Sequence, residues 1–228
     1  MNLYAIPTPL GGSAADALPA SVLEIVRTLK DFAVENAKSA RAFLKDAGCD
    51  VHAISIVEIH PGSESLLKPL REGRPLGLLA EAGCPAIADP GAALVEAAHR
   101  EGFRVVPLVG PSSIALALMA SGLEGQRFAF CGYLPREPLK RKMRIKELEN
   151  RSLREDETEI FIETPYRNDA MLAALLDTCR DTTRLCVAAD LTLPTESVAT
   201  KTVGDWRRRA AEVGRRPAVF LLLAKSDR

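Results

Sequence analysis

The first half of the chain alternates regularly between two kinds of segment, and this alternation constrains the fold most. Short apolar segments typical of buried strands recur at 3–6, 31–35, 51–59, 75–80 and 103–110. Segments with helical spacing separate and follow them at 20–30, 37–48, 62–73, 91–102 and 111–122. Such alternation is typical of a mostly parallel sheet with helices on both faces. We therefore predict an N-terminal α/β domain over residues 1–122.

The second half is less regular, and the composition changes at 122–127. Strand-like segments occur at 128–135, 158–163, 184–190, 196–203 and 216–224. Helical segments are expected at 136–157, which is highly charged, 166–179 and 204–214. This pattern predicts a C-terminal α/β domain over residues 123–228, with a mixed sheet.

Charge and composition narrow the class of protein. Lys and Arg total 30, as do Asp and Glu, so the net formal charge is zero. A protein that depends on non-specific nucleic-acid binding is usually basic, so any RNA contact here would need a local basic patch.

The five cysteines form no C-x-x-C pair, and the three histidines are widely spaced. We expect reduced thiols, no metal and a cytoplasmic location. With neither a signal peptide nor an apolar run of spanning length, we expect no membrane association.

Loops rich in Gly, Pro and Ser follow several expected strands, at 7–12, 81–91, 109–114 and 163–168. Ligands of open parallel sheets bind beyond the carboxyl ends of the strands, where glycine lets the backbone approach a ligand. Ser112 and Ser113 would add hydroxyls and free N–H groups at a helix start. The loops predict a ligand site, although ordinary turns use the same residues. The common dinucleotide, P-loop and serine-hydrolase motifs are absent.

The chain resembles the tetrapyrrole (corrin/porphyrin) methylase superfamily, and within it the branch of bacterial small-subunit ribosomal RNA ribose 2′-O-methyltransferases. The resemblance rests on an ordered set of strings: "LYAIPTPLGG" (3–12), "EAGCPAIADPG" (81–91), "VVPLVGPSSIALALMASGL" (105–123), "FAFCGYLP" (128–135) and "FIETPYR" (161–167). It implies a two-domain α/β fold, a homodimer, and an S-adenosylmethionine-dependent methyltransferase with the cofactor in a cleft between the domains.

The resemblance also implies which residues contact the cofactor. Cys84 stands in a Gly-Cys-Pro turn where the wider superfamily often has an aspartate, so backbone contacts should dominate there. The residues implied are Leu10, Gly83, Cys84, Ile87, Ser112, Ser113, Ile114, Ile162, Asp190 and Ala218.

Methylation of a hydroxyl is helped by a base that takes its proton. Near expected strand ends, the candidates are Glu35, Glu81 and Glu163, together with Lys38 if its pKa is depressed. Each glutamate could instead form a salt bridge or a helix cap. The ribosomal RNA branch usually carries Glu-Asp-Thr-Arg where this chain reads Glu-Asn-Ala-Lys at 35–38, so methyl acceptance could differ while cofactor binding persists.

Three functions therefore stay open at the level of sequence. The chain could methylate ribosomal RNA, methylate a tetrapyrrole or other small molecule, or be a catalytically inactive cofactor-binding paralogue. The basic run at 140–146 could contact RNA phosphates or form a solvated helix face. Arg167 could bind a phosphate or carboxylate, or pair with Glu163. We expect Trp206 to pack in the core.

Overall fold

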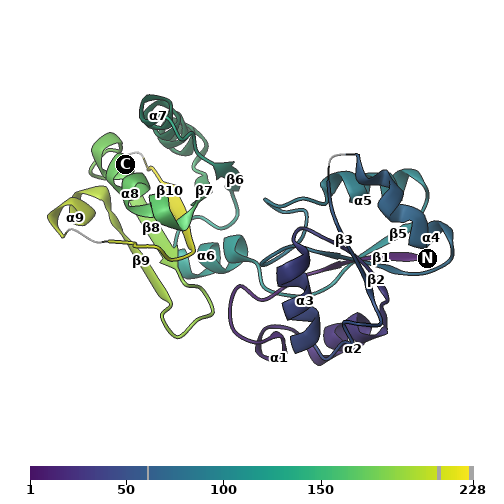
Figure 1. Cartoon of the computed structure of the whole chain (residues 1–228). Helices are drawn as coiled ribbons and strands as arrows, with labels where there is room; N and C mark the ends of the chain where they lie inside the picture. The colour runs from purple at the N-terminus through teal and green to yellow at the C-terminus, as the bar shows by residue number, and fades with distance from the viewer. Residues whose placement is uncertain (61, 210–211, 226–228) are drawn as a thin grey trace. The chain divides into compact units, whose positions relative to one another are not determined.

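The computed structural model describes residues 1–60, 62–209 and 212–225 (Figure 1). Its chain forms two compact units, Met1–Ser112 and Ser113–Arg228. Each unit has its own five-stranded sheet and its own apolar core. The α/β fold class predicted from the sequence is confirmed.

The first unit contains a sheet in which every strand pair is parallel. Its strands lie in the order β3-β2-β4-β1-β5. Their bounds are β1 Asn2–Ile6, β2 Asp31–Val34, β3 Ser55–Glu58, β4 Leu76–Leu79 and β5 Arg104–Pro107. Because the strands are parallel, the loops that follow them all emerge at one edge of the sheet, the carboxyl edge.

Helices cover both faces of this sheet (Figure 1). Their bounds are α1 Ala14–Ala17, α2 Ala20–Thr28, α3 Ala37–Asp46, η1 Ser63–Leu67, α4 Lys68–Arg71 and α5 Ala92–Arg100. On one face, α2 and α3 pack against Phe32 through Val26 and Leu44. On the other, η1, α4 and α5 pack around Leu78. Gly77 in β4 makes room for Phe32, since a Cβ there would lie 2.6 Å from its ring.

Two helical segments differ from the sequence pattern. The expected helix at 62–73 divides into η1 and α4 near Pro69, because proline lacks the N–H that a continuous helix would use. The short α1 was not predicted. It begins after Ser13, whose side chain accepts a hydrogen bond from the Asp16 N–H at 3.2 Å and so caps the turn.

The second unit has a mixed sheet in the order β6-β7-β10-β8-β9, as the sequence predicted. β6 pairs with β7 in parallel, and the other neighbours are antiparallel. The strands are β6 Phe128–Tyr133, β7 Thr158–Glu163, β8 Arg184–Ala189, β9 Ser197–Thr202 and β10 Ala218–Leu223. The helices are α6 Ser113–Ser121, α7 Pro138–Glu155, η2 Pro165–Arg167, α8 Asn168–Thr178 and α9 Val203–Arg208.

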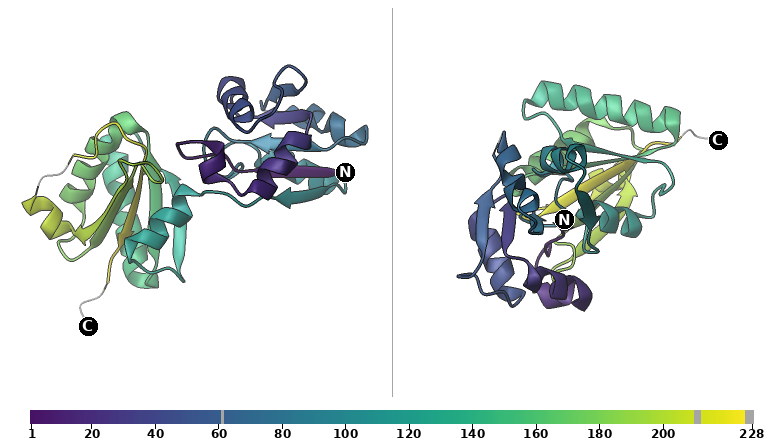
Figure 2. Two further views of the ribbon diagram at one scale, coloured as in Figure 1. Left: turned by 90° about the horizontal axis from the view of Figure 1, so that it is seen from below. Right: turned by 90° about the vertical axis from the view of Figure 1, so that its right-hand side faces the viewer.

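Two stacked aromatic side chains lie in the core of the second unit. Phe161 and Phe220 stack with ring centroids 5.8 Å apart. Helices α7 and α8 pack on the face of the sheet that carries these two rings (Figure 2). Trp206 is buried, and its Nε1 donates to the Leu185 carbonyl at 2.9 Å, which confirms the packing role expected for it.

Helix α6 belongs to the second unit, whereas the boundary expected after residue 122 left it in the first. The helix is apolar on all sides and contacts β8, β9 and β10. Thr200 in β9 also donates its hydroxyl to the Ser121 carbonyl at 2.7 Å. The apolar composition of α6 shows that it needs a sheet to pack on, but not which sheet.

Candidate functional site

The loop after β4, residues 81–91, lies against the loop after β1. Thr8 and Gly83 exchange both backbone hydrogen bonds, with N···O distances of 2.9 and 3.0 Å. Gly83 has φ +80°, and a Cβ there would lie 3.3 Å from the Leu10 side chain. Cys84 Sγ donates to the Pro111 carbonyl at 3.4 Å. The structure thus brings Leu10, Gly83 and Cys84 together, with the segment that leads to Ser112 beside them.

The backbones of these loops approach one another closely. A Cβ at Gly110 would collide with Pro7, so the loops after β1 and β5 can meet only because residue 110 is glycine. Burial raises the pKa of the Cys84 thiol, which keeps it a neutral hydrogen-bond donor. Backbone groups and small apolar side chains line this place, which fits the cofactor contact predicted for it.

The middle of the 81–91 loop adopts a strained backbone. Ala86 and Ala88 have φ values of +66° and +68°, in the left-handed region that non-glycine residues seldom occupy. Between them, Ile87 exposes 48% of its surface. Strain of this kind costs about 1–3 kcal/mol per residue and is concentrated at functional sites. Contact between Ile87 and the cofactor stays a prediction.

Two of the proposed catalytic glutamates take part in the local structure of the carboxyl edge. The Glu81 N–H donates to Glu35 Oε2 at 2.9 Å, so Glu35 fixes the start of the 81–91 loop. Glu81 is itself exposed, and its Oε1 accepts from Ser39 Oγ at 3.3 Å. Asn36 caps α3 by accepting from the N–H groups of Lys38 and Ser39. The Lys38 side chain is exposed.

Asp89 is another carboxylate at this edge, and it is not among the candidate residues predicted from the sequence. Burial raises its pKa to about 6, and the charges of Glu35 and Glu81 add to this effect. The signal present in the sequence was the Asp-Pro-Gly turn that closes the loop. Its significance depends on the fold, because Glu35 lies far from Asp89 along the chain.

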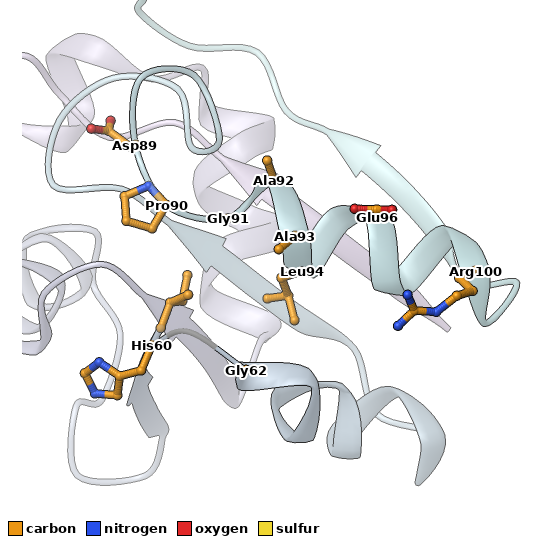
Figure 3. Close-up of a pocket in the computed structure, with 11 residues that line it drawn as sticks. His60, Gly62, Asp89, Pro90, Gly91, Ala92, Ala93, Leu94, Glu96 and Arg100 are labelled. Carbon is orange, nitrogen blue, oxygen red and sulfur yellow. The ribbon is translucent and has the colours of Figure 1, made fainter. Parts of the chain in front are cut away.

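A pocket of about 510 Å³ adjoins Asp89 in the first unit. Its lining comes from the segment after β3 (Ile59, His60 and Gly62), from the end of the 81–91 loop (Asp89 and Pro90) and from α5. Figure 3 shows Asp89 and His60 on either side of Pro90. This volume lies within the range of small-molecule sites.

In the second unit, three predicted cofactor residues gather at one end of the sheet. Ala218 pairs with Ala189, the neighbour of Asp190, and Val219 pairs with Ile162. The Asp190 N–H donates to the Pro217 carbonyl at 2.9 Å. Ser113 and Ile114 begin α6 and are half-buried. The roles of these five residues in cofactor binding stay predictions.

Several charged residues form local ion pairs. Such pairs were the alternative to a functional role for these residues. Arg167 pairs with the fully buried Glu163, and its Nε donates to Thr164 Oγ1 at 3.0 Å. Lys140, Lys142 and Arg144 pair with nearby acids at 2.7–2.8 Å, as expected of a solvated helix face. Arg141, in the same run, is buried instead.

Two features are absent from residues 1–60, 62–209 and 212–225. There is no group of three or more His, Cys, Asp or Glu side chains placed to hold a metal ion. No helix in these ranges has both the length and the apolar character needed to cross a membrane. All five cysteines are free thiols.

Comparison with known proteins gives consistent results for sequence and fold. Residues 22–206 match the family model described as Tetrapyrrole (Corrin/Porphyrin) Methylases. The "Ribosomal RNA small subunit methyltransferase I" of Escherichia coli O157:H7 is 31% identical over 206 residues, covering 90% of this chain and 70% of the relative. The protein of the same name from Xylella fastidiosa is 30% identical over 227 residues, covering 98% and 81%.

Solved structures of low sequence identity share the fold. The cobalamin biosynthetic enzyme cobalt precorrin-4 methyltransferase superposes with a TM-score of 0.62 at 17% identity, covering 97% of this chain and 94% of that one. The methyltransferase CobJ gives a TM-score of 0.63 at 18% identity, covering 98% and 93%. Family model, curated relatives and fold agree, and the chain belongs to the tetrapyrrole (corrin/porphyrin) methylase family.

Proposed function

We propose that this methylase transfers a methyl group from S-adenosylmethionine to a ribose hydroxyl of small-subunit ribosomal RNA. The observation that carries the proposal is the 31% identity, over 90% of the chain, to a relative named for that ribosomal RNA. The likeness to cobalamin biosynthetic enzymes, at 17–18% identity, concerns the fold and gives no support for a tetrapyrrole acceptor.

The loops of the first unit fit the cofactor assigned to them. Gly83 and Gly110 allow close approach of three loops, and Leu10 and Cys84 present an apolar side chain and a neutral thiol there. When bound, S-adenosylmethionine supplies a methyl group on a positively charged sulfonium. The chain's own part is to hold donor and acceptor in line, since positioning can supply about 7–11 kcal/mol of barrier reduction.

Glu35 has a positioning role in this proposal rather than the catalytic role first considered for it. Its carboxylate holds the Glu81 N–H, and the Glu35 N–H donates to the Leu79 carbonyl at 3.1 Å. These bonds fix the point at which the 81–91 loop leaves β4. Glu81 and Lys38 remain exposed candidates for contact with the acceptor.

Labelled methyl transfer tests the acceptor. Small ribosomal subunits from cells that lack the gene are incubated with the protein and S-adenosylmethionine carrying a tritiated methyl group, with a tetrapyrrole acceptor in parallel. Label in ribosomal RNA supports the proposal, and label in the tetrapyrrole alone contradicts it. Calorimetric binding of S-adenosylhomocysteine without any transfer would identify a catalytically inactive paralogue.

The homodimer and the cytoplasmic location also stay predictions. Sedimentation at several protein concentrations tests the first. Fractionation of cells that express the chain at its natural level tests the second.

A further inference from the structure

The pocket beside Asp89 combines apolar walls with two acidic groups, Asp89 and Glu96. Ile59, Pro90 and Leu94 supply apolar surface, and the Asp89 carboxylate lies at the edge (Figure 3). Its volume of about 510 Å³ is sufficient for one nucleoside with its phosphate. Enzymes that modify a nucleoside within RNA commonly take it out of the stack into such a pocket.

The other acidic candidates are already engaged by the protein. Glu35 accepts the Glu81 N–H, and Glu163 pairs with Arg167. Glu81 accepts from Ser39 and is exposed to solvent. Asp89 differs from them, since within the described residues its carboxylate accepts no hydrogen bond while it lines the pocket. Of these four acids, Asp89 is therefore the one whose oxygens are available to a ligand in the pocket, which Glu96 of α5 also lines.

The following inference rests on the proposed function. We propose that the Asp89 pocket holds the acceptor nucleoside and that Asp89 is the base that takes the proton of its ribose hydroxyl. As the hydroxyl oxygen forms its bond to the methyl carbon, the proton passes to the Asp89 carboxylate. The carbon–sulfur bond of the donor breaks and its electron pair stays on sulfur, which neutralises the sulfonium. Asp89 afterwards releases the proton to water.

The surroundings of Asp89 suit this role. A general base works best when its pKa lies near the operating pH, and burial with the charges of Glu35 and Glu81 brings the pKa of Asp89 to about 6. The remaining titratable groups that line the pocket are His60, Glu96 and Arg100. At neutral pH the carboxylate is ionised, yet it is far more basic than an ordinary aspartate.

The test compares Asp89→Asn and Asp89→Glu with the control Asp50→Asn. Asp50 is an exposed aspartate of the same unit that accepts the His52 N–H, a bond that asparagine can also accept. Three quantities are measured: kcat with small ribosomal subunits, the Kd of S-adenosylhomocysteine, and the thermal midpoint at pH 4 and pH 8. The thermal midpoint and the Kd do not depend on turnover.

For Asp89→Asn we expect kcat to fall by about 100-fold or more, the range typical of a lost general base. The Kd of S-adenosylhomocysteine should stay within about threefold, and the thermal midpoint should rise at pH 8 but not at pH 4. Asp89→Glu keeps a carboxylate and should recover part of kcat. In the wild type kcat should fall as the pH drops below about 6.

The outcomes separate this inference from the proposed function. An active wild type together with an Asp89→Asn variant that retains kcat within threefold overturns the role of Asp89 alone. Parallel loss of kcat and of S-adenosylhomocysteine binding overturns it too, because Asp89 would then act in cofactor binding or folding. A wild type that binds S-adenosylhomocysteine but methylates no ribosomal RNA overturns the proposed function, and this inference with it.

Discussion

At the scale of single residues, Gly83 combines a backbone conformation that favours glycine with a place in the predicted cofactor site. It has φ +80°, and a Cβ there would lie 3.3 Å from Leu10 and 3.8 Å from the Pro111 carbonyl. Gly73 has φ +81° but nothing within 4 Å of its Cβ position. The two glycines therefore carry the same conformational demand in different surroundings.

This pair gives a matched prediction. Gly73→Ala and Gly83→Ala should each destabilise the protein by about 1 kcal/mol, because alanine resists a positive φ. Only Gly83→Ala should also weaken S-adenosylhomocysteine, by about tenfold in calorimetry, because its methyl group displaces Leu10. Equal affinity in the two variants would show that Gly83 lies outside the cofactor site.

Asp89 makes stability depend on pH in an unusual direction. Its folded-state pKa of about 6 exceeds the ordinary value of 3.8, so between these pH values the folded chain binds more protons than the unfolded one. Stability is therefore lost as the pH rises through this window. Because Asp89 is only half-buried, solvent screening reduces the loss to about 1 kcal/mol.

Asp89→Asn removes this loss. At pH 8 its thermal midpoint should exceed that of the wild type by about 2–4 °C, and at pH 4 the two should coincide. Scanning calorimetry at both pH values measures the difference. A variant that is less stable than the wild type at pH 8 would mean that Asp89 makes a stabilising contact instead.

At the scale of elements, α3 begins at a cap made by Asn36, where the resemblance to the ribosomal RNA branch implies an aspartate. Asn36 Oδ1 accepts from the N–H of Lys38 at 2.9 Å and of Ser39 at 3.2 Å. The Glu58 carboxylate accepts the Ala37 N–H at 2.7 Å. Asparagine and aspartate cap helices about equally well, so the departure leaves the capping intact.

Asn36→Ala should therefore lower the free energy of unfolding by about 1 kcal/mol, and Asn36→Asp should not. Urea denaturation measures both. If alanine is neutral here, the Glu58 bond to Ala37 would be sufficient to start the helix.

The elements also show how much of the fold and of the candidate site the sequence predicts. Strand–helix alternation predicted the parallel sheet because buried strands such as β4 are apolar on both faces. The Gly/Pro-rich loops predicted the carboxyl edge as the candidate site. Asp89 was not predicted because its raised pKa depends in part on Glu35, which follows β2, besides burial and the charge of Glu81 in its own loop. Likewise, the sheet against which α6 packs depends on contacts made across the fold, and no local pattern specifies them.

At the scale of the whole molecule, the matched residues 22–206 extend through both compact units. The relatives named for ribosomal RNA cover nearly the whole chain as well. The function proposed here therefore belongs to the chain with both of its units, although the candidate acceptor pocket lies within the first.

The most direct test of the account is the identity of the methylated nucleoside. Small ribosomal subunits from cells lacking the gene are treated with the protein and S-adenosylmethionine, and the RNA is digested to nucleosides for mass spectrometry. The account predicts a new nucleoside methylated on the ribose 2′ oxygen, formed about 100-fold more slowly when Asp89→Asn replaces the wild type. Methylation on a base, or RNA left unmodified by a protein that binds the cofactor, would contradict it.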